Sequence, residues 1–247
     1  MIDASEVLVA HADARQSQGR LREPFGGGAA TFDGWRLMAS GLPFAYLNAG
    51  CVTDPVRADL GEAKAWYAAR GVSWGALVPA GSPWPHGRLL MTHQLMAVQA
   101  DAFSEARAPA GLTIRRGGEG DLSAAVLVDA AAFGTDSESS RAWMEPHFVV
   151  DEVEVAIGNL GGIPVATGYA LRCNGDAGPT VYLGGIAVLP AARRRGVAAA
   201  LSSWLLAHGF DQGARFGHLQ CDAEGAGRVY ARLGFVEVDG IEVYVDL

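Results

Sequence analysis

Apolar and polar positions alternate regularly along the second half of the chain. After a polar stretch at 104–111, the pattern restarts with an alternating strand at 112–116. Helices are predicted at 122–133, 137–148, 196–208 and 225–233, and strands at 153–158, 165–172, 181–188, 216–222 and 236–247. This mixture of strands and helices is typical of an α/β (α+β) protein.

The first half shows a similar but less regular alternation. We expect helices at 4–18 and 59–70, and strands at 35–39, 44–49, 73–78 and 89–98. The stretch 104–111 contains Pro and Gly among small and polar residues, which is typical of a linker. The sequence therefore predicts two domains, at residues 1–110 and 111–247.

Composition narrows the class of protein. The chain has 247 residues, half of them hydrophobic, and a formal net charge of −8, which disfavours general binding to nucleic acid. Its 3 cysteines are widely spaced, which indicates reduced thiols in a cytoplasmic protein. No apolar run is long enough to span a bilayer, and the histidines show no metal-ligand spacing. We expect a cytoplasmic protein without a membrane, nucleic-acid or metal partner.

The most informative segment joins a strand to a helix. The strand 181–188 contains Gly184-Gly185 and is followed by Pro190, three arginines and Gly196. A helix that opens with free N–H groups beside a glycine and arginines favours phosphate. The spacing Arg193-x-x-Gly196-x-Ala198 resembles the Arg/Gln-x-x-Gly-x-Gly/Ala signature of the GNAT superfamily of acyl-CoA-dependent N-acetyltransferases. Further along, Tyr230-Ala-Arg-Leu-Gly234-Phe235 resembles the second motif of that family.

The resemblance implies a GNAT fold for 111–247, with a mixed central sheet flanked by helices. It also implies acetyl-CoA as co-substrate and a primary amine of a small molecule, amino acid or peptide as acceptor. A bulge at Gly184-Gly185 would separate two parallel strands. The residues implied to hold acetyl-CoA, by strand pairing or around the pyrophosphate, are Ile186, Ala187, Val188, Arg193, Arg194, Arg195, Gly196, Val197, Ala198 and Ala199.

By the same resemblance, Tyr230 would protonate the departing thiolate, although its ring would equally suit packing against the last strand. His218 takes the position of a general base, although a lone strand histidine is more often structural. Two positions depart from the family pattern: Gly184-Gly185 where some members have a glutamate base, and Ala223 where many have an asparagine. Cys221 is expected to be a buried thiol rather than a nucleophile.

The first half lacks the phosphate-binding signature. We interpret it as a degenerate GNAT-like half, as in tandem relatives, that binds no acetyl-CoA and walls the acceptor site. Aromatic and histidine residues near its loops suit such a wall: Trp35, Tyr46, Trp74, Trp84 and His86. For Trp35 and Trp74, a position in the core is favoured instead. A non-catalytic acyl-CoA-binding regulatory module is the alternative function. The oligomeric state stays open, with a homodimer as one option.

Overall fold

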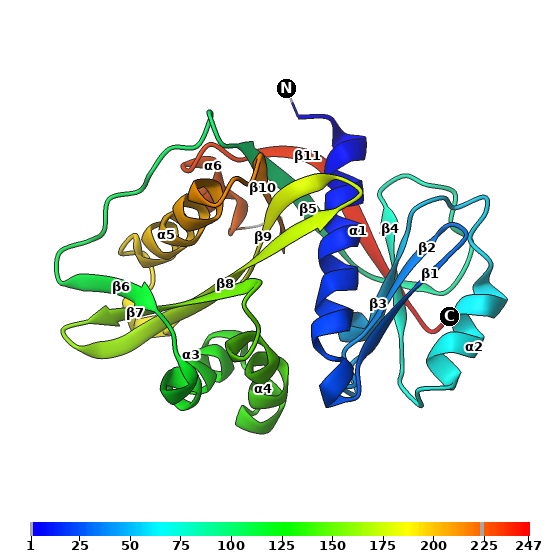
Figure 1. The fold of residues 1–247 in the computed structure, drawn as a ribbon, viewed down its shortest axis with the longest axis horizontal. Helices are drawn as coiled ribbons and strands as arrows, with labels where there is room; N and C mark the ends of the chain where they lie inside the picture. Colours follow the sequence, from blue (N-terminus) through cyan, green and yellow to red (C-terminus); the bar gives the residue numbers. More distant parts are fainter. Residues whose placement is uncertain (1, 223–224) are drawn as a thin grey trace.

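The computed structural model describes residues 2–222 and 225–247, which form one continuous eleven-stranded sheet (Figure 1). The strand order is β1-β2-β3-β4-β11-β5-β10-β9-β8-β7-β6. The strands are β1 (Gly28–Phe32), β2 (Trp35–Ala39), β3 (Ala49–Val52), β4 (Gly75–Pro79), β5 (Arg88–Gln99), β6 (Leu112–Arg116), β7 (Val153–Leu160), β8 (Ile163–Gly175), β9 (Gly178–Val188), β10 (Phe216–Asp222) and β11 (Val236–Val245). The helices are α1 (Ala4–Leu21), α2 (Leu60–Ala68), α3 (Leu122–Phe133), α4 (Ser137–Met144), α5 (Val197–Asp211) and α6 (Gly227–Ala231).

Helices cover both faces of the sheet. Successive strand residues point to opposite faces, so Ile157 of β7 packs in one core with Ala14 of α1, while the neighbouring Ala156 packs in another core with Leu205 of α5. Helices α3 and α4 contribute to the first of these cores. Helix α1 stands across the middle of the molecule in Figure 1 and contacts strands of both halves.

The two halves of the chain exchange strands at the centre of the sheet. Strand β5 from the first half lies between β10 and β11, and β11 from the second half lies between β5 and β4. On either side of this exchange, β3 and β4 are parallel and connected through α2, as β9 and β10 are parallel and connected through α5. The expected domain boundary at 110/111 falls in a coil segment, but the sheet is continuous across the two parts. Each half therefore completes the sheet of the other.

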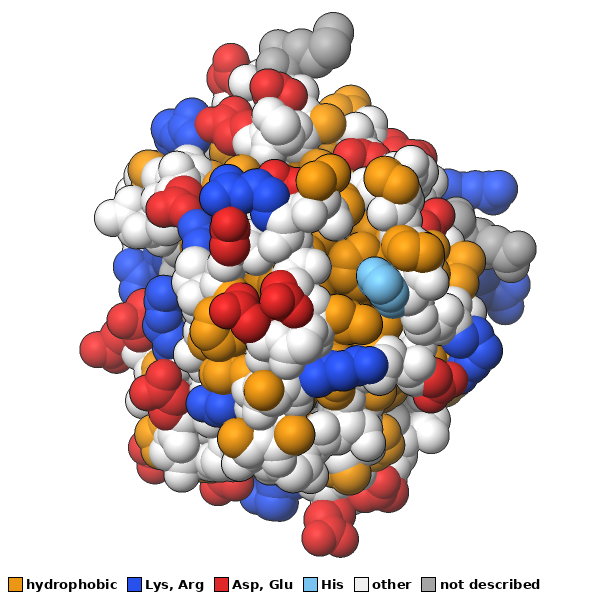
Figure 2. Space-filling view, turned by 90° about the vertical axis from the view of Figure 1, so that its right-hand side faces the viewer, with side chains coloured by type: hydrophobic (Ala, Val, Ile, Leu, Met, Phe, Trp, Pro, Cys, Tyr) orange, Lys and Arg blue, Asp and Glu red, His pale blue; other side chains and the backbone are white. Residues whose placement is uncertain are grey.

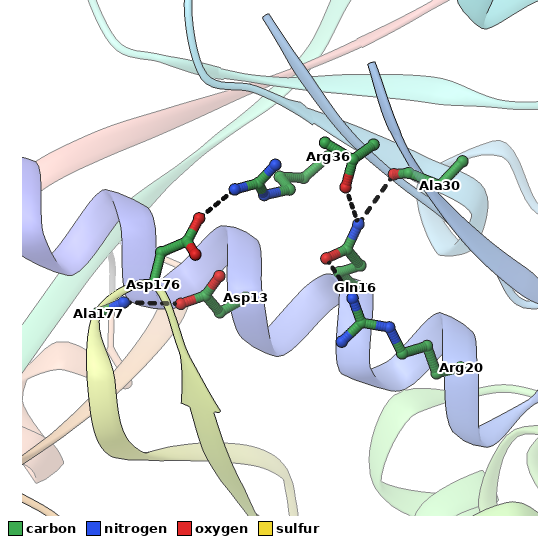
Figure 3. Close-up of polar contacts among 8 residues, drawn as sticks. Asp13, Gln16, Arg20, Ala30, Arg36, Asp176 and Ala177 are labelled. Atoms are coloured by element: carbon green, nitrogen blue, oxygen red, sulfur yellow. Dashed lines mark hydrogen bonds and ion pairs between the residues drawn. The ribbon is translucent and has the colours of Figure 1, made fainter. Parts of the chain in front are cut away.

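Polar contacts of α1 hold the two halves together (Figure 3). Asp13 Oδ2 accepts a hydrogen bond of 3.0 Å from the backbone N–H of Ala177, in the turn between β8 and β9. Arg36 of β2 forms an ion pair with Asp176 in the same turn. One turn further along the same face of the helix, Gln16 Nε2 donates to a backbone carbonyl of β1 over 3.0 Å. The helix thus connects the β1–β2 hairpin to the β8–β9 hairpin.

Two of the predicted elements differ from the structure. The strand expected at 44–49 is instead a 3₁₀ turn at Ala45–Asn48 followed by β3. The cause is the buried side chain of Asn48, which accepts from Ser40 N over 2.7 Å and donates to Ser73 O over 2.8 Å, because such side-chain bonds compete with regular pairing. The helix expected at 137–148 ends at Met144, and a 3₁₀ turn containing Pro146 follows.

The surface beside the first half carries mixed charge. Figure 2 shows the face on the side of α2 and β1–β4, where acidic and basic side chains are interspersed and hydrophobic side chains gather in a shallow central area. On the face drawn there, no continuous basic surface is present. None of the described helices is long and apolar enough to cross a membrane.

Candidate active site

The parallel strands β9 and β10 separate halfway along their length. They pair at Thr180↔Phe216, Val181↔Gly217 and Tyr182↔His218, and no further pair joins their described residues. Beyond this point β9 continues to pair with β8, and β10 continues to pair with β5. The sheet is thus open between the second halves of β9 and β10.

A β-bulge marks the start of the opening, as the sequence predicted for Gly184-Gly185. The pairing with β8 shifts from Tyr169↔Gly184 to Thr167↔Ala187, so that β9 has an extra residue in this interval. Gly185 has φ +60, and a Cβ atom there would lie 2.9 Å from the Tyr169 ring. A side chain would therefore strain the backbone and collide with the ring.

A cavity of about 520 Å³ adjoins the opening at the start of α5. Eight of the residues predicted to hold the cofactor line it: Ile186, Val188, Arg193, Arg194, Gly196, Val197, Ala198 and Ala199. Ala187 is instead buried on the other side of β9, and Arg195 is exposed outside the cavity lining. The turn and the strand edge named by the motif thus share one cavity.

The first turn of α5 presents free backbone donors to this cavity. The first helical hydrogen bond runs from Ala200 N to Gly196 O over 3.0 Å, and no side chain of the described residues caps the helix. By contrast, α1, α2 and α4 are capped by the carboxylates of Asp3, Asp59 and Asp136. The N–H groups at a helix start have no intrahelical partner, and together with the helix dipole they attract an anion.

Four arginines surround this cavity in an otherwise acidic chain. The Arg193 guanidinium donates to the carbonyls of Val188 over 3.1 Å and Ala132 over 2.8 Å, so that its side chain holds the turn against β9 and α3. Arg194 lines the cavity with Arg228 and Arg232 of the α6 region. We did not predict these last two from the sequence, although their spacing of four residues on a helix would have placed them on one face.

A second cavity, of about 500 Å³, adjoins the first at Ile186 and lies beside the bulge. It is lined by β9, β10, α3 and α4, and by residues 44–47 and 91–93 of the first half. Tyr46 is in this wall. The other four aromatic and histidine residues expected near the acceptor site are elsewhere: Trp35, Trp74 and Trp84 pack in the core with α2, and His86 is exposed.

Tyr230 lines the second cavity and is 9% exposed. Its ring also packs edge-on against Phe235, with 5.8 Å between the ring centres. Burial raises the pKa of Tyr230 above its ordinary value, and nearby Cys221 and Tyr182 add to this effect. The phenol is therefore protonated at neutral pH and can act as a proton donor.

His218 does not reach either cavity, which corrects its expected role as base. The side chain is fully buried and packs against Tyr182 and His11, with 5.4 and 6.0 Å between ring centres. Neither ring nitrogen has a hydrogen-bond partner among the described residues. Burial lowers the pKa of His218 to about 3, so the ring is neutral at neutral pH, and it lines neither cavity. Ala223, the other departure from the motif, lies outside the described residues.

Asp129 is the titratable group that sequence reasoning missed. It lies on α3, lines the second cavity and is 7% exposed. Burial raises its pKa to about 6, while the Ser140 hydroxyl acts in the opposite direction. A signal was present in the sequence, since Asp129 is the one charged residue of a largely apolar helix. Buried carboxylates in apolar helices are uncommon unless they have a partner or a function.

Comparisons with known proteins agree with this geometry. Residues 128–235 match the model of the Acetyltransferase (GNAT) family. The open β9–β10 edge and the α5 turn both lie in this segment, which is similar to the GNAT acetyltransferases. A comparison with curated proteins gave no match.

Solved structures extend the likeness over almost the whole chain. A GCN5-related N-acetyltransferase from Kribbella flavida is 20% identical with a TM-score of 0.71, covering 96% of this chain and 95% of that one. One from Sphaerobacter thermophilus is 18% identical with a TM-score of 0.59, covering 98% and 91%. A tandem GNAT protein from the clavulanic acid biosynthesis pathway is 13% identical with a TM-score of 0.56, covering 85% and 77%. At these identities the likeness concerns the fold, and with the two-part sheet it supports a tandem form.

Proposed function

We propose that the protein transfers acetyl from acetyl-CoA to a primary amine by direct attack in a ternary complex. The observation that carries the proposal is the pair of adjoining cavities at the open edge of β9. One contains free helix donors and arginines, and the other contains Tyr230 and Asp129. The family match supports the acetyl donor, and the acid and base in the second cavity suit an amine acceptor.

The first cavity would hold the cofactor. The uncapped N–H groups from Gly196 onward would bind the pyrophosphate, and Arg194, Arg228 and Arg232 would neutralise its charge. The free edge of β9 at 186–188 would pair with the pantetheine amides as an added strand would. Among the described residues, the nearest atom to a Cβ at position 196 would be Pro109 Cγ, 3.7 Å away, which leaves room above the helix start for a phosphate.

The second cavity would bring the amine to the thioester. Asp129 takes one proton from the ammonium group, and the nitrogen attacks the thioester carbonyl. As the C–N bond forms, the C–S bond breaks and Tyr230 gives its proton to the departing sulfur. The remaining proton lost from nitrogen restores the phenol. The products are an amide and the free thiol of CoA, with one proton left on Asp129.

Cys221 also lines the second cavity, but it does not favour an acyl-enzyme route. Burial raises the pKa of this thiol to about 11, so that it stays protonated at neutral pH. A nucleophilic cysteine needs a lowered pKa. Direct attack by the amine is therefore the better mechanism.

Release of free thiol from acetyl-CoA, measured with a panel of amines, tests the proposal. Amine-dependent release is expected, together with one molecule of acetyl-CoA bound per chain by calorimetry. Tight binding without release on any amine would favour the alternative, an acyl-CoA-binding regulatory module.

A further inference from the structure

A buried cation on α1 lies in the wall of the second cavity. Arg15 lines this cavity and is 5% exposed. Its guanidinium donates to Gln18 Oε1 over 3.2 Å and makes longer contacts with Met38 Sδ, at 3.6 Å, and Tyr46 O, at 3.4 Å. Nε has no partner, and among residues 2–222 and 225–247 no carboxylate forms an ion pair with Arg15.

An arginine buried in this way lacks the ion-pair partner that a buried charge normally has. Buried charges are usually paired, because removing an ion from water is costly. The neighbouring Arg22 is also buried, but its guanidinium stacks 4.0 Å from the Trp143 ring and donates to the Trp143 carbonyl, and Arg22 itself does not line the cavity. Arg15 instead borders an open space with donors to spare. A guanidinium presents a planar fork of N–H groups that fits a carboxylate in a bidentate manner.

A short chain of contacts connects this cation to the bulge. Gln18, which accepts from Arg15, donates through Nε2 to the Tyr169 hydroxyl over 2.7 Å. The Tyr169 ring in turn packs on Gly184 and Gly185, where β9 leaves its neighbour. The guanidinium is therefore fixed on the part of the cavity wall that faces the opening of the sheet.

Two aspartates, Asp129 and Asp222, lie on other walls of the same cavity, and Asp222 Oδ1 is 3.2 Å from His93 Nδ1. Asp129 comes from α3, and no ion pair joins it to Arg15. Apolar side chains supply much of the remaining wall, among them Phe44, Leu47 and Trp143. The cavity thus offers a cation, an anion and apolar surface to one occupant.

We propose that the acceptor is a free amino acid with an apolar side chain, whose carboxylate binds Arg15 while its amine faces Asp129. This rests on the proposed acetyl transfer and names the substrate class of that site. Arg15 acts on specificity: it selects acceptors that carry a carboxylate.

Calorimetry on the 247-residue chain saturated with CoA tests the proposal. The probes are L-leucine, L-methionine and L-phenylalanine, each compared with its carboxamide, which keeps the amine and side chain but removes the negative charge. At least one acid should bind about 100-fold more tightly than its amide, because a site built for a charged partner rejects the analogue that lacks it. Arg15→Gln should reduce this preference to a few-fold.

Arg20→Gln is the matched control, since Arg20 lies on the same helix but is exposed and lines neither cavity. The control should keep the full preference. Equal affinity for acid and amide in the wild type, or a preference that survives Arg15→Gln, would overturn the proposal. If Arg15→Gln fails to fold by thermal unfolding, Arg15→Lys decides: it keeps the charge but not the fork, and a reduced preference for the acid is expected.

Thiol release on the same probes separates this inference from the proposed function. Release with the amides as readily as with the acids would leave acetyl transfer intact and remove the role of Arg15. A clear preference for the acid in binding, with no thiol release on any amine, would support the carboxylate site and contradict acetyl transfer.

Discussion

The phenol ring of Tyr169 lies against the backbone of Gly184, so closely that a Cβ atom on this glycine would come within 2.5 Å of the ring. The hydroxyl of Tyr169 is held by Gln18 from α1, in the other half of the chain. The shape of the bulge, and with it the opening between β9 and β10, is therefore set by a helix more than 150 residues earlier in the sequence.

Gly184→Ala should displace the Tyr169 ring and narrow the opening. Overpacking of this kind typically costs about 1–3 kcal/mol of stability. We also expect the rate of acetyl transfer to fall at least about tenfold, because a narrower opening would misplace the reacting groups. Thermal unfolding and steady-state rates measure the two effects. Gly120→Ala is the control, because a Cβ atom there meets no atom of the described residues within 4 Å. Normal turnover by Gly184→Ala would show that the close contact does not shape the site.

Tyr230→Phe should lower kcat by about 10²–10⁴-fold, the usual range for a general acid, with little change in the affinity for acetyl-CoA. Because the pKa of Tyr230 is raised, the wild-type rate should show no loss from this residue up to about pH 10, the ordinary value for tyrosine. Tyr244→Phe, on β11 and outside both cavities, is the control. A Tyr230→Phe enzyme with full kcat would assign the ring a packing role alone.

Asp129→Asn should remove the acid limb of the pH–rate profile. The wild-type kcat/KM for the amine should fall as the pH drops through about 6, because the carboxylate is then protonated and can no longer accept a proton. In the variant the rate should be low at every pH, with acetyl-CoA still bound. Asp211→Asn, at the exposed end of α5, is the control. An unchanged acid limb in Asp129→Asn would assign the base to another group.

The double variant Arg228→Gln and Arg232→Gln should weaken acetyl-CoA binding by about tenfold or more, in line with the usual strength of charge-assisted hydrogen bonds. The wild-type affinity should fall with added salt, and that of the variant less so. Arg88→Gln, an exposed arginine on β5, is the control. Calorimetry gives both affinity and stoichiometry.

One acetyl-CoA is expected per chain. In the first half, Asp59 Oδ1 accepts from Gly61 N over 2.7 Å and from Glu62 N over 3.4 Å, so a carboxylate already occupies the helix start that corresponds to the open one of α5. It would repel a second pyrophosphate. Two cofactors per chain would contradict this interpretation.

Stability should decrease as the pH falls below about 6.5, the ordinary pKa of histidine. His11, His147 and His218 are buried, and burial lowers the pKa of each in the folded state. The unfolded chain therefore binds more protons, and each group costs about 1.4 kcal/mol per pH unit until its folded pKa is reached. Asp129, whose pKa is raised, opposes this loss of stability between about pH 6 and pH 3.8.

Denaturant unfolding at several pH values measures how steeply stability depends on pH. His218→Leu should reduce this slope, and the exposed-site control His86→Gln should leave it unchanged.

The sequence by itself determined the local structure and the cofactor turn. The segment from β9 through Gly196 into α5 is contiguous, so its glycines, arginines and helix start could be interpreted without knowing the rest of the fold. Even there, the backbone conformation of Gly196 became known only from the structure. Gly196 has φ +82, so that a side chain at 196 would strain the backbone as well as approach a phosphate, and Gly196→Val would test folding together with binding.

Only the tertiary structure decided which groups meet in the acceptor cavity. His218 and Asp129 are both titratable residues flanked by apolar ones, and the sequence pattern alone gave no reason to prefer Asp129. Packing of α1 over β10 buries His218, while α3 presents Asp129 to the cavity. The exchange of β5 and β11 likewise depends on pairing between segments far apart in sequence, so a fragment of 112–247 would lack the strand between β10 and β11. Arg15 reaches the cavity because its helix, α1, packs against strands of both halves of the chain. Local patterns fix which residues form a strand or helix, but burial, and with it charge state and access, depends on the elements that pack around them.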